Sequence, residues 1–127
     1  DPRYKLELYR RFAGLDYGEK DDLLDEIIDR FGEPPEEVEV LWRVACLRAL
    51  CRLLHIRGIS VKPGELRITF AENAAIDPTA LMQLISEQQQ YMNFKSGAQA
   101  QLIFRTVKLK TDSLTWLEKN LPRLAFD

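Results

Sequence analysis

A few side chains in this sequence could do chemistry, and the first candidates are a histidine and a cysteine. Cys51 and His55 stand four residues apart, a spacing that puts both on one face of a helix. Such a pair could act as nucleophile and base, or begin a zinc site. The chain has no other histidine, and its second cysteine, Cys46, falls on a different helical face. We therefore expect buried thiols rather than a metal site or a catalytic pair.

Other patterns typical of enzymes are absent from the sequence. Neither GxxxxGK[ST] nor GxGxxG occurs, so no glycine-rich loop is available to cradle phosphates. No serine stands in a nucleophile-elbow context. The sequence therefore predicts that this chain is not an enzyme and needs no cofactor of its own.

Charged residues before a helix stop offer a different kind of chemistry, namely recognition. The segment DEIIDRFGEPPEE, residues 25–37, places Glu26, Asp29 and Arg30 at positions i, i+3 and i+4, which share one helix face. This charged stripe could be a solvated face, with Glu26 paired to Arg30 along the helix. It could also be a docking surface, and residue types alone leave both interpretations open.

The charges are unevenly distributed along the chain. The net charge is −2, but residues 1–39 hold 13 acidic and 6 basic residues, and residues 40–127 hold 7 and 12. An acidic N-terminal region suits a basic protein partner. The basic remainder, with Arg105, Lys108 and Lys110, suggests an alternative as an accessory domain contacting nucleic acid or RNA polymerase, although a pI near 5.5 argues against it.

Length and composition predict one globular domain over residues 1–127. Hydrophobic residues make up 46% of the chain, which is enough for a core. No apolar run reaches the roughly 18 residues that a membrane helix needs. The chain starts without methionine, which suggests a fragment of a longer protein.

The charged stripe must be positioned by a helical N-terminal segment. Periodic apolar residues predict helices over residues 4–13 and 19–31, and a glycine, Gly32, to end the second. Pro34 and Pro35 block its continuation, and Pro35 is placed as the first residue of a third helix reaching His55. That long helix is apolar on most sides, so we expect it to be buried all round. Phe31 continues the apolar face of the second helix and should lie in the core.

The remainder of the chain predicts a small sheet. Residues 57–70 alternate around a Pro63-Gly64 turn, as in a β-hairpin. Asp77 should cap a helix to about residue 90, and strands should follow over residues 91–95 and 100–107. Asp112 should cap a last helix that ends at Pro122. The fold class is therefore α+β: three N-terminal helices with a long central one, then a mainly antiparallel sheet with two further helices.

Two segments carry a resemblance to a known family. LELYRRFAGL and EIIDRFGEPPEEVEVLWRVACLRALCRLLHIRGI resemble the C-terminal domain of bacterial transcription-repair coupling factors (Mfd). The shared features are an LYRR-type first helix, an E-x-x-D-R-F-G-x-x-P helix–turn–helix and a long helix leading to a hairpin. The match extends over nearly the whole chain and is looser beyond about residue 91.

The resemblance implies a regulatory role within a large DNA translocase of transcription-coupled nucleotide excision repair. The motor, with its ATP and Mg, would lie upstream, as would the modules that bind RNA polymerase and UvrA. This domain would pack on the UvrB-like module of the same cytoplasmic polypeptide, mask its UvrA-binding surface and restrain the motor. The stripe Glu26, Asp29 and Arg30 would lie at that contact, while Gly32, Pro34 and Pro35 would fix the angle between two helices.

Overall fold

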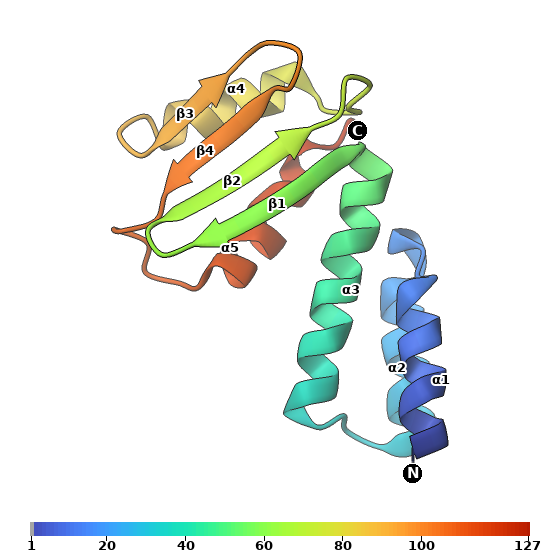
Figure 1. Cartoon of the computed structure of the whole chain (residues 1–127). Helices are drawn as coiled ribbons and strands as arrows, with labels where there is room; N and C mark the ends of the chain where they lie inside the picture. The colour runs from blue at the N-terminus through green and yellow to red at the C-terminus, as the bar shows by residue number, and fades with distance from the viewer. Residues whose placement is uncertain (1) are drawn as a thin grey trace. The chain divides into compact units, whose positions relative to one another are not determined.

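The computed structural model describes residues 2–127 of the chain (Figure 1). Its contacts cluster into two compact units, which meet in the chain at Leu50 and Cys51. The helices and strands, in chain order, are α1 (Pro2–Ala13), η1 (Tyr17–Glu19), α2 (Lys20–Phe31), α3 (Glu36–Leu54), β1 (Ile56–Lys62), β2 (Glu65–Phe70), α4 (Pro78–Glu87), β3 (Met92–Lys95), β4 (Gln101–Arg105), α5 (Ser113–Asn120) and η2 (Leu121–Leu124). The predicted α+β class is confirmed.

The N-terminal unit is a helical assembly around one apolar core. α1 and α2 run beside the first part of α3 (Figure 1). Each helix contributes residues at helical spacing to the core. Full burial of a Val, Leu, Ile or Phe side chain stabilises the fold by roughly 1.5–3 kcal/mol. The core consists of Leu8, Phe12, Leu15, Leu23, Ile27, Val38, Ala45, Cys46 and Ala49.

A short helix that the sequence did not predict connects α1 to α2. The Asp16 side chain accepts a hydrogen bond from the Gly18 amide at 3.2 Å and caps η1. Because Glu19 belongs to this short helix, α2 begins at Lys20 instead of Glu19. The difference of one residue is within the usual uncertainty of helix ends.

The stop between α2 and α3 follows the glycine and proline residues. Gly32 has φ +81°, in the region open to glycine, and its amide donates to the Ile28 carbonyl at 2.8 Å. The Pro35 carbonyl accepts from the amides of Val38 and Glu39, both at 3.0 Å. Pro35 therefore lies one position before the first residue of α3, where its missing N–H leaves no gap in the helix.

The expectation that α3 is buried all round is wrong. Val40, Leu41 and Leu53 are 41%, 39% and 56% exposed. The buried residues of α3 are Val38, Ala45, Cys46, Ala49, Leu50 and Leu54, and they do not include every apolar side chain of the helix. A helix can therefore be apolar in sequence on most sides and still be covered along only one stripe.

The C-terminal unit is built on a four-stranded antiparallel sheet with strand order β1-β2-β4-β3. The β1–β2 hairpin turns at Gly64, whose φ of +79° is that of the predicted type II turn. The register pairs Lys62 with Glu65 and Glu65 in turn with Arg105. β4 ends at Arg105, two residues earlier than predicted, because the Thr106 amide turns to the Gly64 carbonyl at 3.0 Å.

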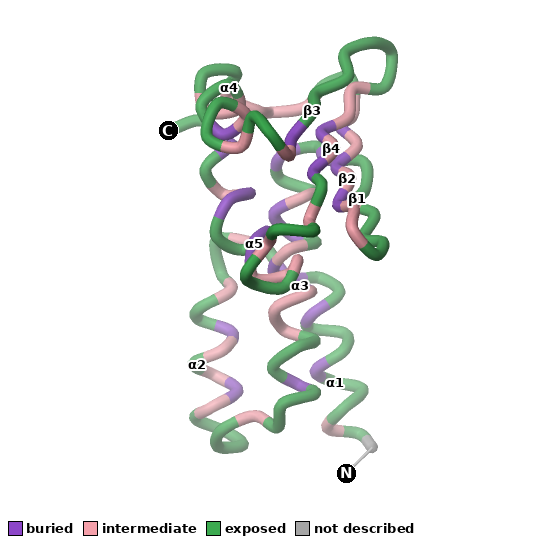
Figure 2. Tube along the Cα trace, turned by 90° about the vertical axis from the view of Figure 1, so that its left-hand side faces the viewer, coloured by how far each residue is buried: buried purple, intermediate pink, exposed green. Residues whose placement is uncertain are grey.

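Two helices cover one face of this sheet. α4 and α5, with η2 between them and the C-terminus, lie on the same side of the strands (Figures 1 and 2). The buried strand residues alternate, as β2 and β4 show with Leu66, Ile68, Leu102 and Phe104. Both predicted caps form: Asp77 accepts from the Thr79 amide at 3.0 Å and begins α4, and Asp112 accepts from the Thr115 amide at 2.7 Å and begins α5. No helix in the described part of the chain is long and apolar enough to span a bilayer.

Candidate functional site

The charged stripe lies on α2 beside its buried face, toward α1. α2 buries Leu23 and Ile27, and the stripe residues occupy the adjoining arc of the helix. The side chain of Glu26 is 43% exposed, and Asp29 and Arg30 are exposed. The structure thus places all three on the surface of the N-terminal unit, where another molecule can reach them.

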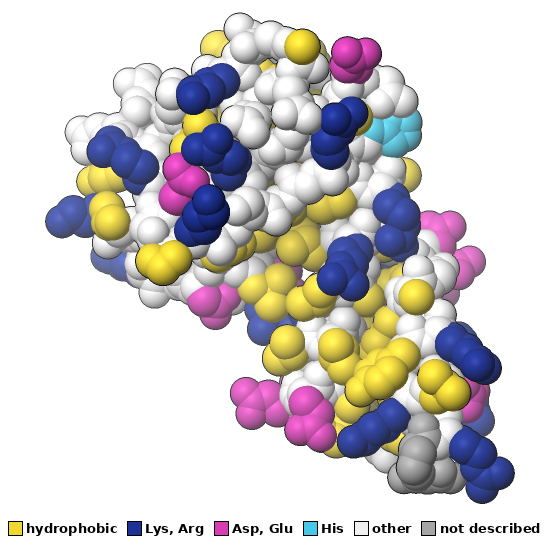
Figure 3. All heavy atoms as spheres, in the orientation of Figure 1, with side chains coloured by type: hydrophobic (Ala, Val, Ile, Leu, Met, Phe, Trp, Pro, Cys, Tyr) yellow, Lys and Arg dark blue, Asp and Glu magenta, His cyan; other side chains and the backbone are white. Residues whose placement is uncertain are grey.

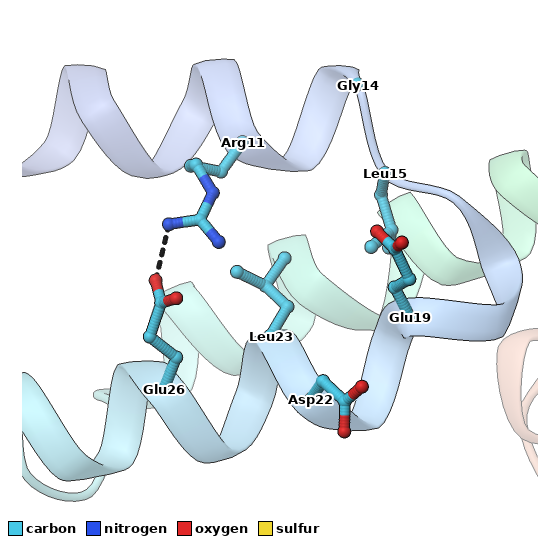
Figure 4. A pocket seen from close by; sticks show the side chains of 7 residues that line it. All are labelled: Arg11, Gly14, Leu15, Glu19, Asp22, Leu23 and Glu26. Carbon is cyan, nitrogen blue, oxygen red and sulfur yellow. Dashed lines mark hydrogen bonds and ion pairs between the residues drawn. The ribbon is translucent and has the colours of Figure 1, made fainter.

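Two of the stripe residues already have partners on α1. The Arg11 guanidinium donates to the Glu26 carboxylate (Figure 4), and Arg30 donates to Glu7 at 3.3 Å. The two residues, which the sequence allowed to pair along α2, thus hydrogen-bond to α1, and Arg30 acts on Glu26 through its charge. Because α1 packs beside α2, each of the two residues reaches an oppositely charged side chain on α1.

The pairing with Arg11 changes the acidity of Glu26. The hydrogen bond from the Arg11 guanidinium holds the pKa of the Glu26 carboxyl below its usual range, and the nearby charge of Arg30 acts in the same direction. The same hydrogen bond raises the pKa of Arg11. Glu26 consequently takes up a proton at a lower pH than an unpaired glutamate does.

Asp29 differs from its two neighbours in the stripe. Within the described residues its carboxylate has no hydrogen-bond or ion-pair partner. An exposed carboxylate with free lone pairs can accept two parallel hydrogen bonds from an arginine. Asp29 is therefore the stripe residue most open to a new partner.

A groove runs between α1 and α2 next to the stripe. It has a volume of about 220 Å³ and opens to solvent. Figure 4 shows Arg11 and Glu26 joined across it, with Asp22 in the first turn of α2 and Glu19 at the end of η1. The full lining is Arg11, Gly14, Leu15, Glu19, Asp22, Leu23 and Glu26. Carboxylates dominate this lining, and it holds no nucleophile, so its chemistry is that of binding.

Phe31 lies outside the core, contrary to the expectation from the sequence. It is 41% exposed, its ring centroid lies 4.1 Å from that of Tyr4, and the Arg30 guanidinium lies 5.0 Å from the ring centroid. Phe31 is the last residue of α2, and Ile27, one turn earlier, is the last α2 residue in the apolar core. Phe31 thus forms an aromatic contact beside the stripe.

Sequence reasoning missed the two α1 residues that complete this surface. Glu7 and Arg11 stand four residues apart and share a helix face, with charges complementary to Arg30 and Glu26. That spacing was a usable signal. It became informative only once α1 and α2 were known to lie side by side.

The candidates for catalysis are placed differently. The His55 Nδ1 lies 2.9 Å from the Asn73 carbonyl oxygen, and His55 adopts φ +55° directly after α3. Burial raises the pKa of Cys51 to about 11, and both cysteines are free thiols. Among residues 2–127 no group of three or more His, Cys, Asp or Glu side chains could hold a metal ion.

Comparisons with known proteins identify the family. The profile of the TRCF domain matches residues 1–81. The chain is 37% identical over 87 residues to the transcription-repair-coupling factor of Bacillus subtilis, which covers 66% of this chain and 7% of that protein. It is 27% identical over 125 residues to that of Escherichia coli, covering 98% of this chain and 11% of that protein.

A solved structure shares the fold along the whole chain. The crystal structure of a C-terminal domain of transcription-repair coupling factor aligns with a TM-score of 0.73 at 22% identity, over 98% of this chain and 83% of that one. The chain spans only about a tenth of the length of the relatives that it matches. It belongs to the TRCF domain family, the C-terminal domain of transcription-repair coupling factors.

Proposed function

We propose that this chain is a non-catalytic autoinhibitory domain that docks on the UvrB-like, UvrA-binding module of its own polypeptide. The docked domain masks the UvrA-binding surface and restrains the DNA translocase. UvrA is then a competitor for the same surface. RNA polymerase, DNA, ATP and Mg are partners of the parent protein in the cytoplasm, and the docking proposal assigns none of their binding sites to the charged stripe.

The observation that carries the proposal is the exposed charged stripe on α2. Asp29 has no partner within the described residues, and the ion pairs of Glu26 and Arg30 to α1 are half-exposed. Exposed pairs of this kind contribute little to folding, so exchanging one intramolecular arginine for another from a partner costs little. The stripe can therefore dock and release without disturbing the core.

Contacts between charged side chains suit a domain that must dissociate from its docking surface. Pairs between carboxylates and arginines give specificity and orientation more than raw affinity. A docked state held by a few such pairs can be displaced by a competitor that binds the undocked state better. Phe31, exposed beside Arg30, can add an apolar contact at the edge of the same surface.

Calorimetric titration of the chain with the isolated UvrB-like module tests this proposal. Glu26→Lys combined with Asp29→Lys should abolish the heat of binding, because two attractive contacts become repulsive. A matched control, Asp21→Lys with Glu39→Lys, makes the same change in charge at exposed positions outside the stripe. That control should bind as the unaltered chain does.

Circular dichroism melts of both variants separate docking from folding. Equal binding by the stripe variant and the unaltered chain contradicts the proposed surface. If the control variant loses as much binding as the stripe variant does, net charge and not the stripe explains the loss. If no protein binds in trans, UvrA capture by the full-length parent becomes the readout, since a tethered contact can be too weak to detect when it is separated. There the stripe variant should capture UvrA more strongly than the parent.

A further inference from the structure

The sheet of the C-terminal unit has one face that no helix of this unit covers. α4, α5 and η2 all lie on the other side (Figures 1 and 2). Residues paired across antiparallel strands point to the same side, and those between the buried positions point away from the helices. We call this side the open sheet face.

Basic residues dominate the open sheet face. The register brings Lys62, Glu65 and Arg105 into one cross-strand row, with Arg67 and Lys95 in the rows beyond. Arg67 donates to Glu65 at 3.2 Å, so this pair is neutral as a unit. Lys62, Lys95 and Arg105 remain exposed, giving the face a net charge of +3. Figure 3 shows several Lys and Arg side chains on the side of the C-terminal unit where the strands face the viewer.

The three cations are not neutralised within the described structure. Neither Lys62 nor Lys95 has an ion-pair partner among residues 2–127. Arg105 donates a hydrogen bond to the Gln90 carbonyl, which fixes the side chain and leaves its charge in place. The face therefore presents three positive charges from β1, β3 and β4.

The neutral residues of this face are hydrogen-bonding side chains. Ser60 and Asn93 are exposed on it, and the register places Ile103 between Arg67 and Asn93. Gln101 donates to the Thr69 hydroxyl and accepts from Arg67, both at 3.1 Å, so these two side chains hold Arg67 in place. Protein interfaces are typically built on an aromatic or aliphatic centre and are depleted in lysine. Hydroxyl, amide and cationic groups without such a centre are instead the groups that contact phosphate oxygens.

We propose that the open sheet face binds the phosphate backbone of double-stranded nucleic acid without reading its sequence. Strands lie about 4.8 Å apart, so Lys62 and Arg105, two strands from each other, are separated by roughly 10 Å. A duplex carries one charge per about 1.7 Å along its axis and supplies several phosphates over that span. The aromatic side chain at the edge of the face is Tyr91, and the Arg105 guanidinium lies 6.0 Å from its ring centroid, so this ring is already paired with a cation. Tight binding of single strands needs several aromatic rings on which successive bases can stack. This inference does not depend on docking by the charged stripe.

Fluorescence anisotropy of a labelled 25-base-pair duplex of arbitrary sequence tests the proposal on the complete chain. Three phosphate contacts predict weak binding at 20 mM salt, with log K falling against log salt at a slope of about −2.7. Lys62→Gln combined with Lys95→Gln should reduce that slope by about 2 and weaken binding at least about tenfold at low salt. Lys62→Arg with Lys95→Arg keeps both charges and should preserve binding.

A matched control removes two cations elsewhere. Lys5→Gln with Arg10→Gln changes the net charge equally on α1, and both residues are exposed. An equal loss in this control, or no binding at 20 mM salt, overturns the proposal. Tighter binding of single-stranded DNA overturns the choice of duplex, and polyglutamate that binds at least as tightly as the duplex would show that the face serves an acidic protein segment.

Discussion

Glu26 illustrates how one carboxylate can serve both the fold and a partner. Its hydrogen bond from Arg11 joins α2 to α1, and its half-exposed position leaves it open to a second arginine. Because the hydrogen bond favours the ionised form, the folded chain holds the pKa of Glu26 below that of the unfolded chain. Glu26 therefore stabilises the fold only while it is charged.

This linkage predicts the pH dependence of a single substitution. Stability from a lowered carboxyl pKa is present above the unfolded pKa of about 4.5 and is lost as the pH falls through the folded pKa. Glu26→Gln should lower the melting temperature at pH 7, and the difference from the unaltered chain should shrink progressively as the pH falls below about 4.5. Circular dichroism melts over a series of pH values provide the measurement, with Asp25→Asn as the control. A difference that stays constant as the pH falls would contradict the ion pair as the cause.

Cys51 allows a second prediction about a single residue. Burial raises the pKa of its thiol to about 11, and only the thiolate is nucleophilic. At pH 8 its thiolate fraction should be a few hundred times lower than that of an ordinary cysteine with a pKa of about 8.5. Iodoacetamide should therefore label Cys51 slowly in the folded chain and rapidly in urea. Mass spectrometry of Cys46→Ser isolates this site, and fast native labelling would contradict the assignment.

At the scale of elements, helix caps are local features whose effects can be measured directly. Asp77 accepts a hydrogen bond from the Thr79 amide at the start of α4, and its own amide donates to the Leu124 carbonyl. Asp77→Ala removes only the first of these and should cost about 0.5–2 kcal/mol in the free energy of unfolding. Asp77→Asn keeps a hydrogen-bond acceptor and should reduce the free energy of unfolding much less. Urea unfolding of the unaltered chain and the two variants measures these reductions. Equal reductions in the two variants would mean that the charge of Asp77, and not its capping hydrogen bond, is responsible.

Local signals predicted these elements well. Both aspartate caps, the Gly64 turn and the stop at Gly32 follow from backbone chemistry that extends over four residues. The sequence failed where the answer depended on which helices become neighbours. The partner of Glu26 and the exposure of Phe31 are fixed by α1 lying against α2, a contact that no local pattern encodes. The docking role of the stripe likewise depends on a partner outside this chain and stays a prediction.

At the scale of the whole molecule, the two units carry charge of opposite sign. Residues 1–50 hold 13 acidic and 8 basic residues, a net charge of −5, whereas residues 51–127 hold 7 and 10, a net charge of +3. The sum of −2 therefore understates the fields that another molecule meets. Two such chains can attract each other by bringing unlike units together, and this attraction is screened over about 10 Å at 0.1 M salt.

This charge division predicts the sign of a salt effect in light scattering. If net charge dominated, adding salt at pH 7 would screen repulsion and lower the second virial coefficient. With opposite units, raising the salt from 10 to 150 mM should screen attraction and raise the coefficient. Asp25→Lys combined with Lys95→Glu keeps the net charge at −2 while reducing the two units to −3 and +1. The rise in the coefficient should be smaller in that variant, because the attraction depends on the opposite charges of the two units. A coefficient that falls with salt in the unaltered chain would contradict the division of charge as the controlling feature.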